Sequence, residues 1–579
     1  MTRTTRRVLL GVVLLLVALA WLGFRTVQLR GHLVAARAVL ASVPTTLDGE
    51  SGARLGGQAR AASAEVRAAR SVANDPVMWT AAHVPILGRS FALARGVADV
   101  SERIVDRVLV PASTAAGTFQ QGKLLDRGRV DLALLASLQD PLRRASTASR
   151  AARVRADRLP DSLIPVYLLR QRTELVTQVD RLDNALSAAA VAVRLAPDML
   201  GGNGARRYFL AVQNNAEARG TGGLIGAYAV ITADHGKLTR ERVGTDRDLR
   251  AAKRNVIDLG QEYDRHYDQY LARSDWRSAV LTAEWPSAAA TISALWTEIS
   301  RQRVDGVIGI DPRSMAAVLA ATGPVDAGGQ SIGADNVVSF VTRDEYTVFA
   351  TRPDERKQVL SQLAAGIFDK VISGQGSASG LVKAFATAGR EGHLQLWSTH
   401  PTEQGVLGVG SLGGRLPNTR SSLEVVSSNA AGSKLDSYVR RTVGYSRAGG
   451  RATATVTLLN TVDPTAVPDF VKSRVDKFGF NPTIKGLDGA TSQLLTVYGG
   501  VGQNMYGVTI DGRTVPAEFG FEQGHPYMTV TVELRPRVPL VVGVTMSDAG
   551  GELLYRQQPL TADDALDIAV PFRTTGRAG

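Results

Sequence analysis

The chain has no cysteine among its 579 residues. This absence excludes disulfides, thiolate metal sites and cysteine nucleophiles, so a fold of this length depends on its hydrophobic core. Histidine is also scarce, and the seven histidines show no HExxH or other zinc-binding spacing, which argues against a metalloprotease. The GxSxG elbow of serine hydrolases and the GxxxxGKS/T loop of nucleotide-binding enzymes are missing as well. We therefore predict no metal site and assign no catalytic residue.

Lysine supplies only ten of the 67 basic residues, so the net charge of +13 comes mainly from arginine. One interpretation is an anionic partner, such as nucleic acid, lipid headgroups or a phosphorylated glycan. The other is a coding bias toward arginine, with the guanidinium groups spread over solvated surfaces. The N-terminal hydrophobic run of the chain predicts export, which argues against nucleic acid, and we predict no nucleic-acid partner.

One long hydrophobic run is present. Residues 8–24 carry no charge, and three arginines precede them. This length lies at the short end of what spans a bilayer as a helix, and the arginines favour a cytoplasmic N-terminus. We therefore predict a cytoplasmic tail over 1–7, a single-pass signal anchor in the cytoplasmic membrane over 8–24, and the rest of the chain outside the cell. The alternative is a cleaved signal peptide ending at Ala18-Leu19-Ala20.

Residues 26–198 show helical periodicity. Apolar residues recur at alternating spacings of three and four, most regularly between Leu175 and Val193, as in helices that pack against one another. Prolines, Pro141 among them, are interpreted as breaks between helices. We predict a stalk of antiparallel helices; a helix lying on a membrane surface is the alternative.

From residue 206 onward, strand-like and helix-like patterns alternate. The continuous apolar run from Val304 to Ile310 is typical of a strand covered on both faces. Asp311 and Pro312 are a typical N-cap and first residue of a helix, and Gly323 is a typical helix end. This alternation predicts an α/β domain over 206–400.

The pattern changes again after residue 400. Residues 401–422 are rich in glycine, and 408–413 match GxGxxG, but no strand precedes that motif and no helix follows it, so we predict no dinucleotide cofactor. Beyond residue 423 the hydrophobic period is two, which predicts a β-sandwich over 423–575 after a linker over 401–422. The predicted fold class is multidomain α+β, with an N-terminal transmembrane helix, a helical stalk, a central α/β domain and a C-terminal β-sandwich.

The stretch from Gln213 to Gly223 is a candidate site, because it combines amides, an acid, a guanidinium and glycines at the end of a predicted buried strand. The alternative is a loop whose polar groups satisfy one another. A second candidate lies at a helix that begins with Pro353, where Arg356 and Lys357 occupy the first turn and oppose the helix dipole. A bound anion would explain these cations; neutralisation by Asp354 and Glu355 is the alternative.

We expect the cations to form one positive wall, with amides as polar contacts, in a single cleft. The candidate ligand-binding residues are Asn214, Asn215, Glu217, Arg219, Arg343, Arg352, Arg356 and Lys357.

Three segments carry a resemblance to a family of exported bacterial envelope proteins known as domain of unknown function 4012. They are residues 207–223, the segment from Val304 to Val325, and Ser428-Asn429-Ala430-Ala431-Gly432-Ser433-Lys434-Leu435-Asp436. The resemblance is close over about 205–440 and loose elsewhere. It implies an exported protein for which the family supplies no established activity.

A more distant resemblance is to the LytR-CpsA-Psr phosphotransferases. The order of Val304-Asp305-Gly306, Gly323-Pro324-Val325, Arg343 and Arg356 is similar to theirs. That family moves glycopolymers from polyprenyl pyrophosphate carriers to the cell wall, and arginines at positions resembling Arg343 and Arg356 hold the pyrophosphate. The chain lacks the family's early Asp-Thr-Met and Pro-Arg-Asp segments, and Gln358 follows Lys357 where a second arginine is expected. The resemblance thus implies a pyrophosphate site but assigns no acid for magnesium.

Taken together, these patterns predict a membrane-anchored, extracytoplasmic envelope protein whose α/β domain binds an anionic or lipid-linked glycan. One alternative is a LytR-CpsA-Psr-like glycopolymer phosphotransferase, which would need Asp246, Asp248 or Glu217 beside the arginines and Mg²⁺ as its cofactor. Otherwise we predict no cofactor. The second alternative is a non-catalytic envelope scaffold whose stalk or β-sandwich binds partner proteins.

Overall fold

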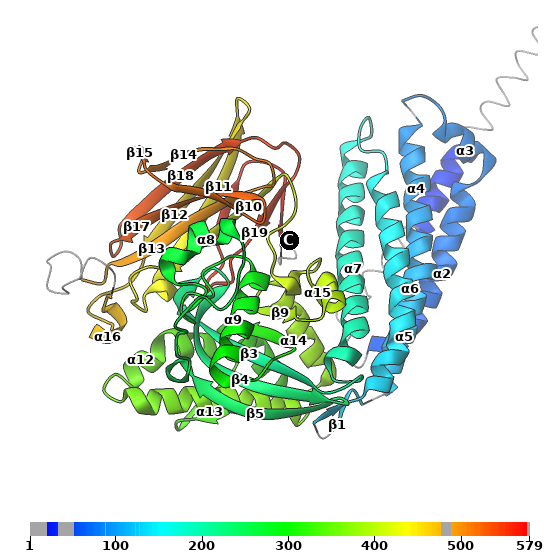
Figure 1. Cartoon of the computed structure of the whole chain (residues 1–579). Helices are drawn as coiled ribbons and strands as arrows, with labels where there is room; N and C mark the ends of the chain where they lie inside the picture. Colours follow the sequence, from blue (N-terminus) through cyan, green and yellow to red (C-terminus); the bar gives the residue numbers. More distant parts are fainter. Residues whose placement is uncertain are drawn as a thin grey trace, which may run out of the picture. The chain divides into compact units, whose positions relative to one another are not determined.

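The computed structural model describes most of the chain. The described residues are 20–32, 51–86, 88–121, 123–126, 128–475 and 488–575. They form two compact units: the first comprises the described residues up to Leu124 together with Asp131–Met199, and the second comprises Leu125–Val130 and the described residues from Leu200 onward (Figure 1).

The predicted transmembrane anchor is corrected by the structure. Residues 8–19 of the predicted span, like the predicted tail, lie outside the described residues. Residues 20–24 begin a helix that continues to residue 32 with Arg25 and Arg30 in it, and Arg25 forms an ion pair with Asp75 at 3.1 Å. No helix in the described ranges is long and apolar enough to cross a membrane. The prediction of a membrane-spanning signal anchor over 8–24 is therefore wrong for the part of the chain that the structure describes.

The first unit is built from helices that share a small-residue core. Its elements are α2 (Ser51–Ala73), α3 (Pro76–Ala82), α4 (Arg89–Ile104), the π-helical segment η1 (Val105–Leu109), α5 (Val110–Gln121), α6 (Leu132–Asp157) and α7 (Val166–Met199). Val66 of α2, Val100 of α4, Ala152 of α6 and Val179 of α7 are buried together. Pro141 does not break α6 as predicted, because buried Leu138 and Leu142 on either side hold the helix in the bundle despite a cost of about 3 kcal/mol.

The second unit contains a mixed seven-stranded sheet. Its order is β1-β2-β5-β4-β3-β6-β9, and within it β3 and β6 are parallel whereas the other neighbours are antiparallel. The strands are β1 (Leu125–Asp126), β2 (Arg129–Val130), β3 (Arg206–Arg219), β4 (Gly222–Asp234), β5 (Lys237–Thr245), β6 (Gly306–Ile310) and β9 (Leu394–Ser398).

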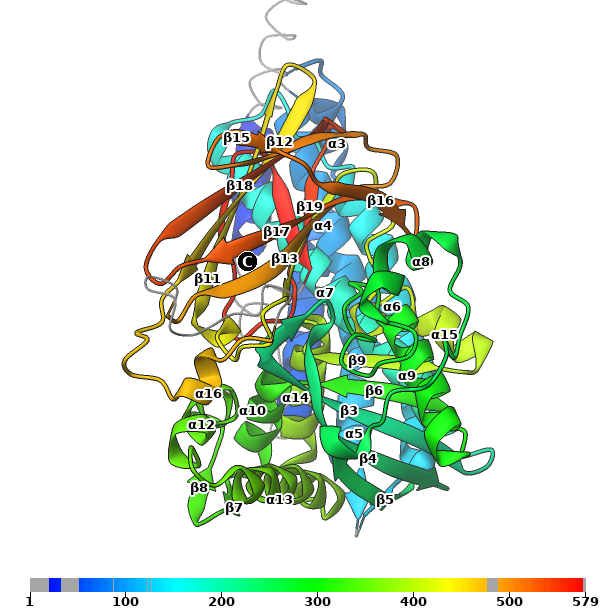
Figure 2. The same ribbon diagram turned by 60° about the vertical axis from the view of Figure 1, so that its left-hand side comes forward.

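Helices cover both faces of this sheet. On one face, Phe209 and Val307 pack with Trp296 of α9 (Trp285–Ser300). On the other face, Val212 and Ile310 pack against the core of α10 (Pro312–Thr322) and α13 (Pro353–Ile372). Figure 2 shows α13 near β5 and β7. The buried strand and the helix after it are confirmed: the Asp311 carboxylate accepts hydrogen bonds from the first-turn amides, and Gly323 ends α10 with a φ of 80°.

Two six-stranded sheets enclose the largest apolar core of the unit, as a β-sandwich does. The first sheet contains β16 (Glu518–Glu522), β17 (His525–Leu534), β13 (Thr491–Gly499), β10 (Ser422–Asn429), β19 (Leu553–Arg556) and β21 (Phe572–Thr575). The second contains β15 (Arg513–Val515), β14 (Met505–Ile510), β18 (Pro539–Ser547), β12 (Arg451–Asn460), β11 (Val439–Ala448) and β20 (Ala565–Ile568).

Short elements complete the unit and carry much of the candidate site. They are η2 (Asp246–Asp248), α8 (Gln261–Tyr267), η3 (Asp268–Tyr270), β7 (Val325–Ala327), β8 (Gln330–Ile332), α11 (Val337–Ser339), η4 (Phe340–Asp344), α12 (Glu345–Val348), α14 (Ala378–Arg390), α15 (Pro401–Leu407), η5 (Ser411–Gly413), η6 (Asp436–Tyr438) and α16 (Asp469–Lys472). The segment predicted as a linker over 401–422 thus contains α15 and η5, and all three large sheets belong to the same unit.

Candidate anion-binding site

The polar stretch predicted from Gln213 to Gly223 forms the hairpin between β3 and β4. The pairing register shifts twice here, between Val212 and Gln213 and between Asn214 and Ala218. The side-chain oxygen of Gln213 accepts hydrogen bonds from the Thr221 hydroxyl (2.9 Å) and the Gly223 amide (3.2 Å). Some polar groups of this stretch therefore form hydrogen bonds with one another and stabilise the hairpin, which agrees with the alternative interpretation of a self-satisfied loop.

Arg219 and Asn215 also lie in buried structural networks. Arg219 is 8% exposed, and its guanidinium donates to the carbonyl oxygens of Arg277 (3.0 Å), Ala218 (2.9 Å) and Asn429 (3.2 Å). Asn215 donates to the carbonyl oxygen of Pro559 at 2.8 Å. Burial lowers the pKa of Arg219. These two residues join β3 to the segments around the β-sandwich.

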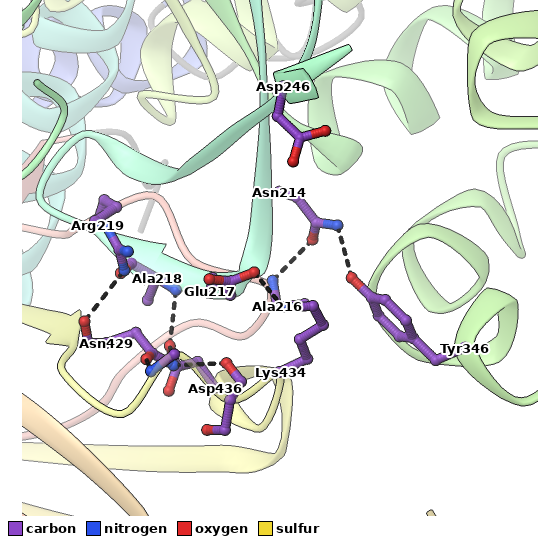
Figure 3. A network of polar contacts seen from close by, with 12 residues as sticks. Asn214, Ala216, Glu217, Ala218, Arg219, Asp246, Tyr346, Asn429, Lys434 and Asp436 are labelled. Carbon is purple, nitrogen blue, oxygen red and sulfur yellow. Dashed lines mark hydrogen bonds and ion pairs between the residues drawn. The ribbon is translucent and has the colours of Figure 1, made fainter. Parts of the chain in front are cut away.

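Asp436 anchors the same junction. Its carboxylate accepts hydrogen bonds from the Ala218 amide (2.7 Å), Asn429 Nδ2 (2.8 Å) and Gln493 Nε2 (3.0 Å). Burial raises the pKa of Asp436 to about 6, although these hydrogen bonds oppose the shift. Figure 3 shows Arg219, Asn429 and Asp436 at one end of the polar network and Asn214 with Tyr346 at the other.

Asn214 and Glu217 belong to the other end of the network. Asn214 Nδ2 donates to the Tyr346 hydroxyl (3.1 Å) and to the carbonyl oxygen of Val341 (3.2 Å). Glu217 forms an ion pair with Lys434, whose ammonium nitrogen lies 5.1 Å from the centre of the Phe470 ring. A cation from the segment after β10 and a ring from α16 thereby meet the end of β3.

Arg356 is a buried cation that has no carboxylate partner among the described residues. It is 8% exposed, and its guanidinium carbon lies 4.9 Å from the centre of the Tyr346 ring and 4.8 Å from that of Phe470. Its Nε atom is buried without a hydrogen-bond partner, and no carboxylate in the described ranges forms an ion pair with it. The aromatic contacts stabilise the cation without neutralising it.

Glu345 stands beside this cation as a buried acid. It is 1% exposed, and its Oε2 atom has no hydrogen-bond partner among the described residues. Burial raises the pKa of Glu345 to about 8, against the opposing effects of Arg356, Lys357 and Lys434 and of a hydrogen bond with Tyr346. The carboxyl is therefore mainly neutral at pH 7.

Of the remaining predicted cations on or near α13, Lys357 and Arg352 have carboxylate partners, whereas half-buried Arg343 contacts an aromatic ring. Lys357 forms an ion pair with Asp246, and Arg352 is exposed and paired with Glu355 at 2.7 Å. The guanidinium carbon of Arg343 lies 5.8 Å from the centre of the Tyr438 ring. The five predicted cations thus do not form one uncompensated positive wall.

We call the group around Arg356 the Arg356 cluster. It consists of Asn214, Glu217, Glu345, Tyr346, Arg356, Lys434 and Phe470. Four of these residues, Glu345, Tyr346, Lys434 and Phe470, were not predicted from the sequence. Lys434 could have been proposed as a site residue from the sequence, because it lies in the segment 428–436 that supports the family resemblance. No local pattern distinguishes Phe470.

The three carboxylates predicted for a phosphotransferase each have a partner in the structure. Asp246 and Glu217 each form an ion pair with a lysine. The Asp248 carboxylate accepts a hydrogen bond from the Thr245 amide at 2.9 Å and so caps the N-terminus of η2. Among the described residues, no group of three or more histidines and acids is arranged to hold a metal ion.

A comparison with known protein-family models finds a match in the middle of the chain. Residues 203–346 match the model described as "Protein of unknown function (DUF4012)". Residues 203–346 are a DUF4012 domain. This confirms the first resemblance, whereas the similarity to the LytR-CpsA-Psr family is not shown. No curated protein and no solved structure matches the chain.

The DUF4012 domain supplies only part of the Arg356 cluster. Asn214, Glu217, Glu345 and Tyr346 lie within the matched residues, the last two at its very end. The other three members, Arg356, Lys434 and Phe470, come from later segments. The candidate site is therefore completed by chain that follows the DUF4012 domain.

Proposed function

We propose that this protein binds an anionic glycan, and that the Arg356 cluster holds the anionic group. The observation that carries the proposal is the buried Arg356 guanidinium, which forms no ion pair with any described residue and has one buried donor, Nε, without a hydrogen-bond partner among them. A buried cation without a partner is costly, and a bound anion removes that cost. Guanidinium is also the side chain best suited to phosphate and carboxylate, because it offers several N–H donors in one plane.

The charge of the cluster supports a single anionic group. Lys434 and Glu217 neutralise each other, and the Glu345 carboxyl is mainly neutral at pH 7 because burial raises its pKa to about 8. Arg356 then leaves one net positive charge. A phosphodiester or a sugar carboxylate carries the one negative charge that matches it.

The surroundings of Arg356 favour a sugar as the carrier of that charge. Phe470 is 50% exposed and lies beside the guanidinium, so a sugar ring has an apolar surface on which to pack. Binding sites of this kind combine aromatic surface with a few well-placed polar groups. A lipid-linked glycan presents two adjacent phosphoryl groups in its pyrophosphate, each with one negative charge. A glycan of the cell envelope fits the exported location implied by the resemblance, and that location stays a prediction.

Calorimetric titration with poly(glycerol phosphate) tests the proposal, with neutral dextran as the ligand control. We expect Arg356→Gln to weaken binding at least about tenfold, because hydrogen bonds to charged groups contribute about 1.5–3 kcal/mol. Arg352→Gln is the matched control, since this arginine lies four residues earlier, is exposed and is paired with Glu355. It should change affinity less than about twofold.

Two results would contradict the proposal. One is wild-type affinity in a folded Arg356→Gln protein, with folding judged by its urea midpoint. The other is equal binding of dextran and poly(glycerol phosphate). Competition by inorganic pyrophosphate would indicate that the lipid-linked form of the ligand also fits the site.

A further inference from the structure

The proposed function leaves the Glu345 carboxyl without a role. This side chain is more deeply buried than Glu217, the other acid of the Arg356 cluster, yet its Oε2 atom has no partner among the described residues. Arg356 likewise has a buried, unpaired Nε atom. Two unpaired polar groups in one buried cluster are unusual, because each costs free energy unless a ligand or water satisfies it.

We propose that Glu345 is a second ligand-binding residue of this site, and that its carboxyl proton is donated to the same oxyanion that Arg356 holds. The inference rests on the proposed function and adds a donor to it. The ligand class is narrowed to oxyanions with one charge and at least two accepting oxygens, such as a phosphodiester or a uronate.

The groups around Glu345 are consistent with this role. Arg356 and Lys357 face it from α13, Lys434 from the segment after β10, and Tyr346 from its own helix. Lys357 and Lys434 already have carboxylate partners in Asp246 and Glu217. Arg356 is the one cation of this set without such a partner in the described part of the chain.

Ionisation of Glu345 would change the site in two ways. An ionised carboxylate has no proton to donate, and it places a negative charge beside Arg356 that competes with the ligand. Both effects weaken binding in the same direction. Since burial holds the Glu345 pKa at about 8, ligand affinity should be constant below neutral pH and should fall in mildly alkaline solution.

The test is a titration with poly(glycerol phosphate) at fixed ionic strength between pH 6 and 9, a range in which phosphodiesters do not change charge. For the wild-type protein we expect affinity to fall about tenfold from pH 7 to pH 9, which follows from a single group with a pKa of about 8. Glu345→Gln keeps a donor and cannot ionise, so its affinity should stay within about twofold across the range. Glu355→Gln, which removes an exposed carboxylate of α13, is the matched control and should keep the wild-type profile.

The outcomes separate this inference from the proposed function. If Arg356→Gln binds like the wild type, the proposed function fails and the role of Glu345 fails with it. If Arg356→Gln loses affinity but Glu345→Gln shows the same alkaline fall as the wild type, only the role of Glu345 is refuted. A wild-type profile that is flat up to pH 9 refutes it as well, and this measurement needs no variant to fold.

Discussion

Replacing Arg219 by methionine separates a structural arginine from a ligand-binding one. The change removes three charge-assisted hydrogen bonds, to the carbonyl oxygens of Arg277, Ala218 and Asn429. Each contributes about 1.5–3 kcal/mol, while removal of the buried charge also relieves a desolvation cost of several kcal/mol. We expect a net loss of about 3 kcal/mol in the free energy of unfolding of the second unit.

Arg356→Met is the matched comparison, because Arg356 has the same exposed fraction, 8%, but its side chain forms no hydrogen bond or ion pair among the described residues. Its loss removes two aromatic contacts worth about 1 kcal/mol each, and it also removes a buried unpaired donor that costs about 1–3 kcal/mol. These effects offset each other. Removal of the buried charge relieves its desolvation cost as well, so the free energy of unfolding should not fall by more than about 1 kcal/mol.

Urea unfolding followed by tryptophan fluorescence measures the difference. Trp276, Trp285 and Trp296 are buried in the second unit, so its unfolding changes their emission. With a slope of about 3 kcal/mol per M, the Arg219→Met midpoint should fall by about 1 M and the Arg356→Met midpoint by less than about 0.3 M. Equal midpoints for Arg219→Met and the wild type, or an equally large fall for Arg356→Met, would refute the assignment of the two arginines.

Two further predictions concern stability. The Glu345 pKa is about 8 in the folded chain against 4.5 for an ordinary glutamate, so the folded state holds the proton more tightly than the unfolded state. The free energy of unfolding should therefore fall by up to about 5 kcal/mol as pH rises from 4.5 to 8. Urea midpoints measured across this pH range should fall less for Glu345→Gln than for the wild type. Gly220→Ala should destabilise the second unit by about 3 kcal/mol or more, because the added Cβ would overlap the carbonyl oxygens of Leu281 and Thr282. Gly226→Ala is the control: its Cβ would lie 3.8 Å from the nearest atom, so the melting temperature should stay within about 1 °C of wild type. Equal melting temperatures for both variants would contradict this reasoning.

Local signals predicted the elements that depend on neighbours in sequence. The α10 helix begins and ends where Asp311, Pro312 and Gly323 indicate, because capping uses backbone groups within one turn. Pro141 shows the limit of such signals. The proline lies inside α6, where the packing of buried leucines outweighs its local cost.

The candidate site was predicted only in part, for a comparable reason. Arg356 and Lys357 are adjacent in the first turn of α13, so the sequence pattern predicts the same anion-binding role for both. In the structure Lys357 meets Asp246, whereas Arg356 turns toward the rings of Tyr346 and Phe470. The partner of Lys357 lies 111 residues away in the chain. No local pattern predicts which of two adjacent cations finds such a carboxylate.

The sequence alone determined that the chain has no thiol chemistry, where its hydrophobic period changes, and where its best-capped helix begins, because these depend on composition and short-range order. The tertiary structure alone decided which charges remain unpaired. Neutralisation of a charge depends on distance through space, and the neutrality of Glu345 depends on its removal from water. The sequence offered Arg356 as one of five candidate cations, and the fold distinguished it because its guanidinium is buried without a carboxylate partner among the described residues.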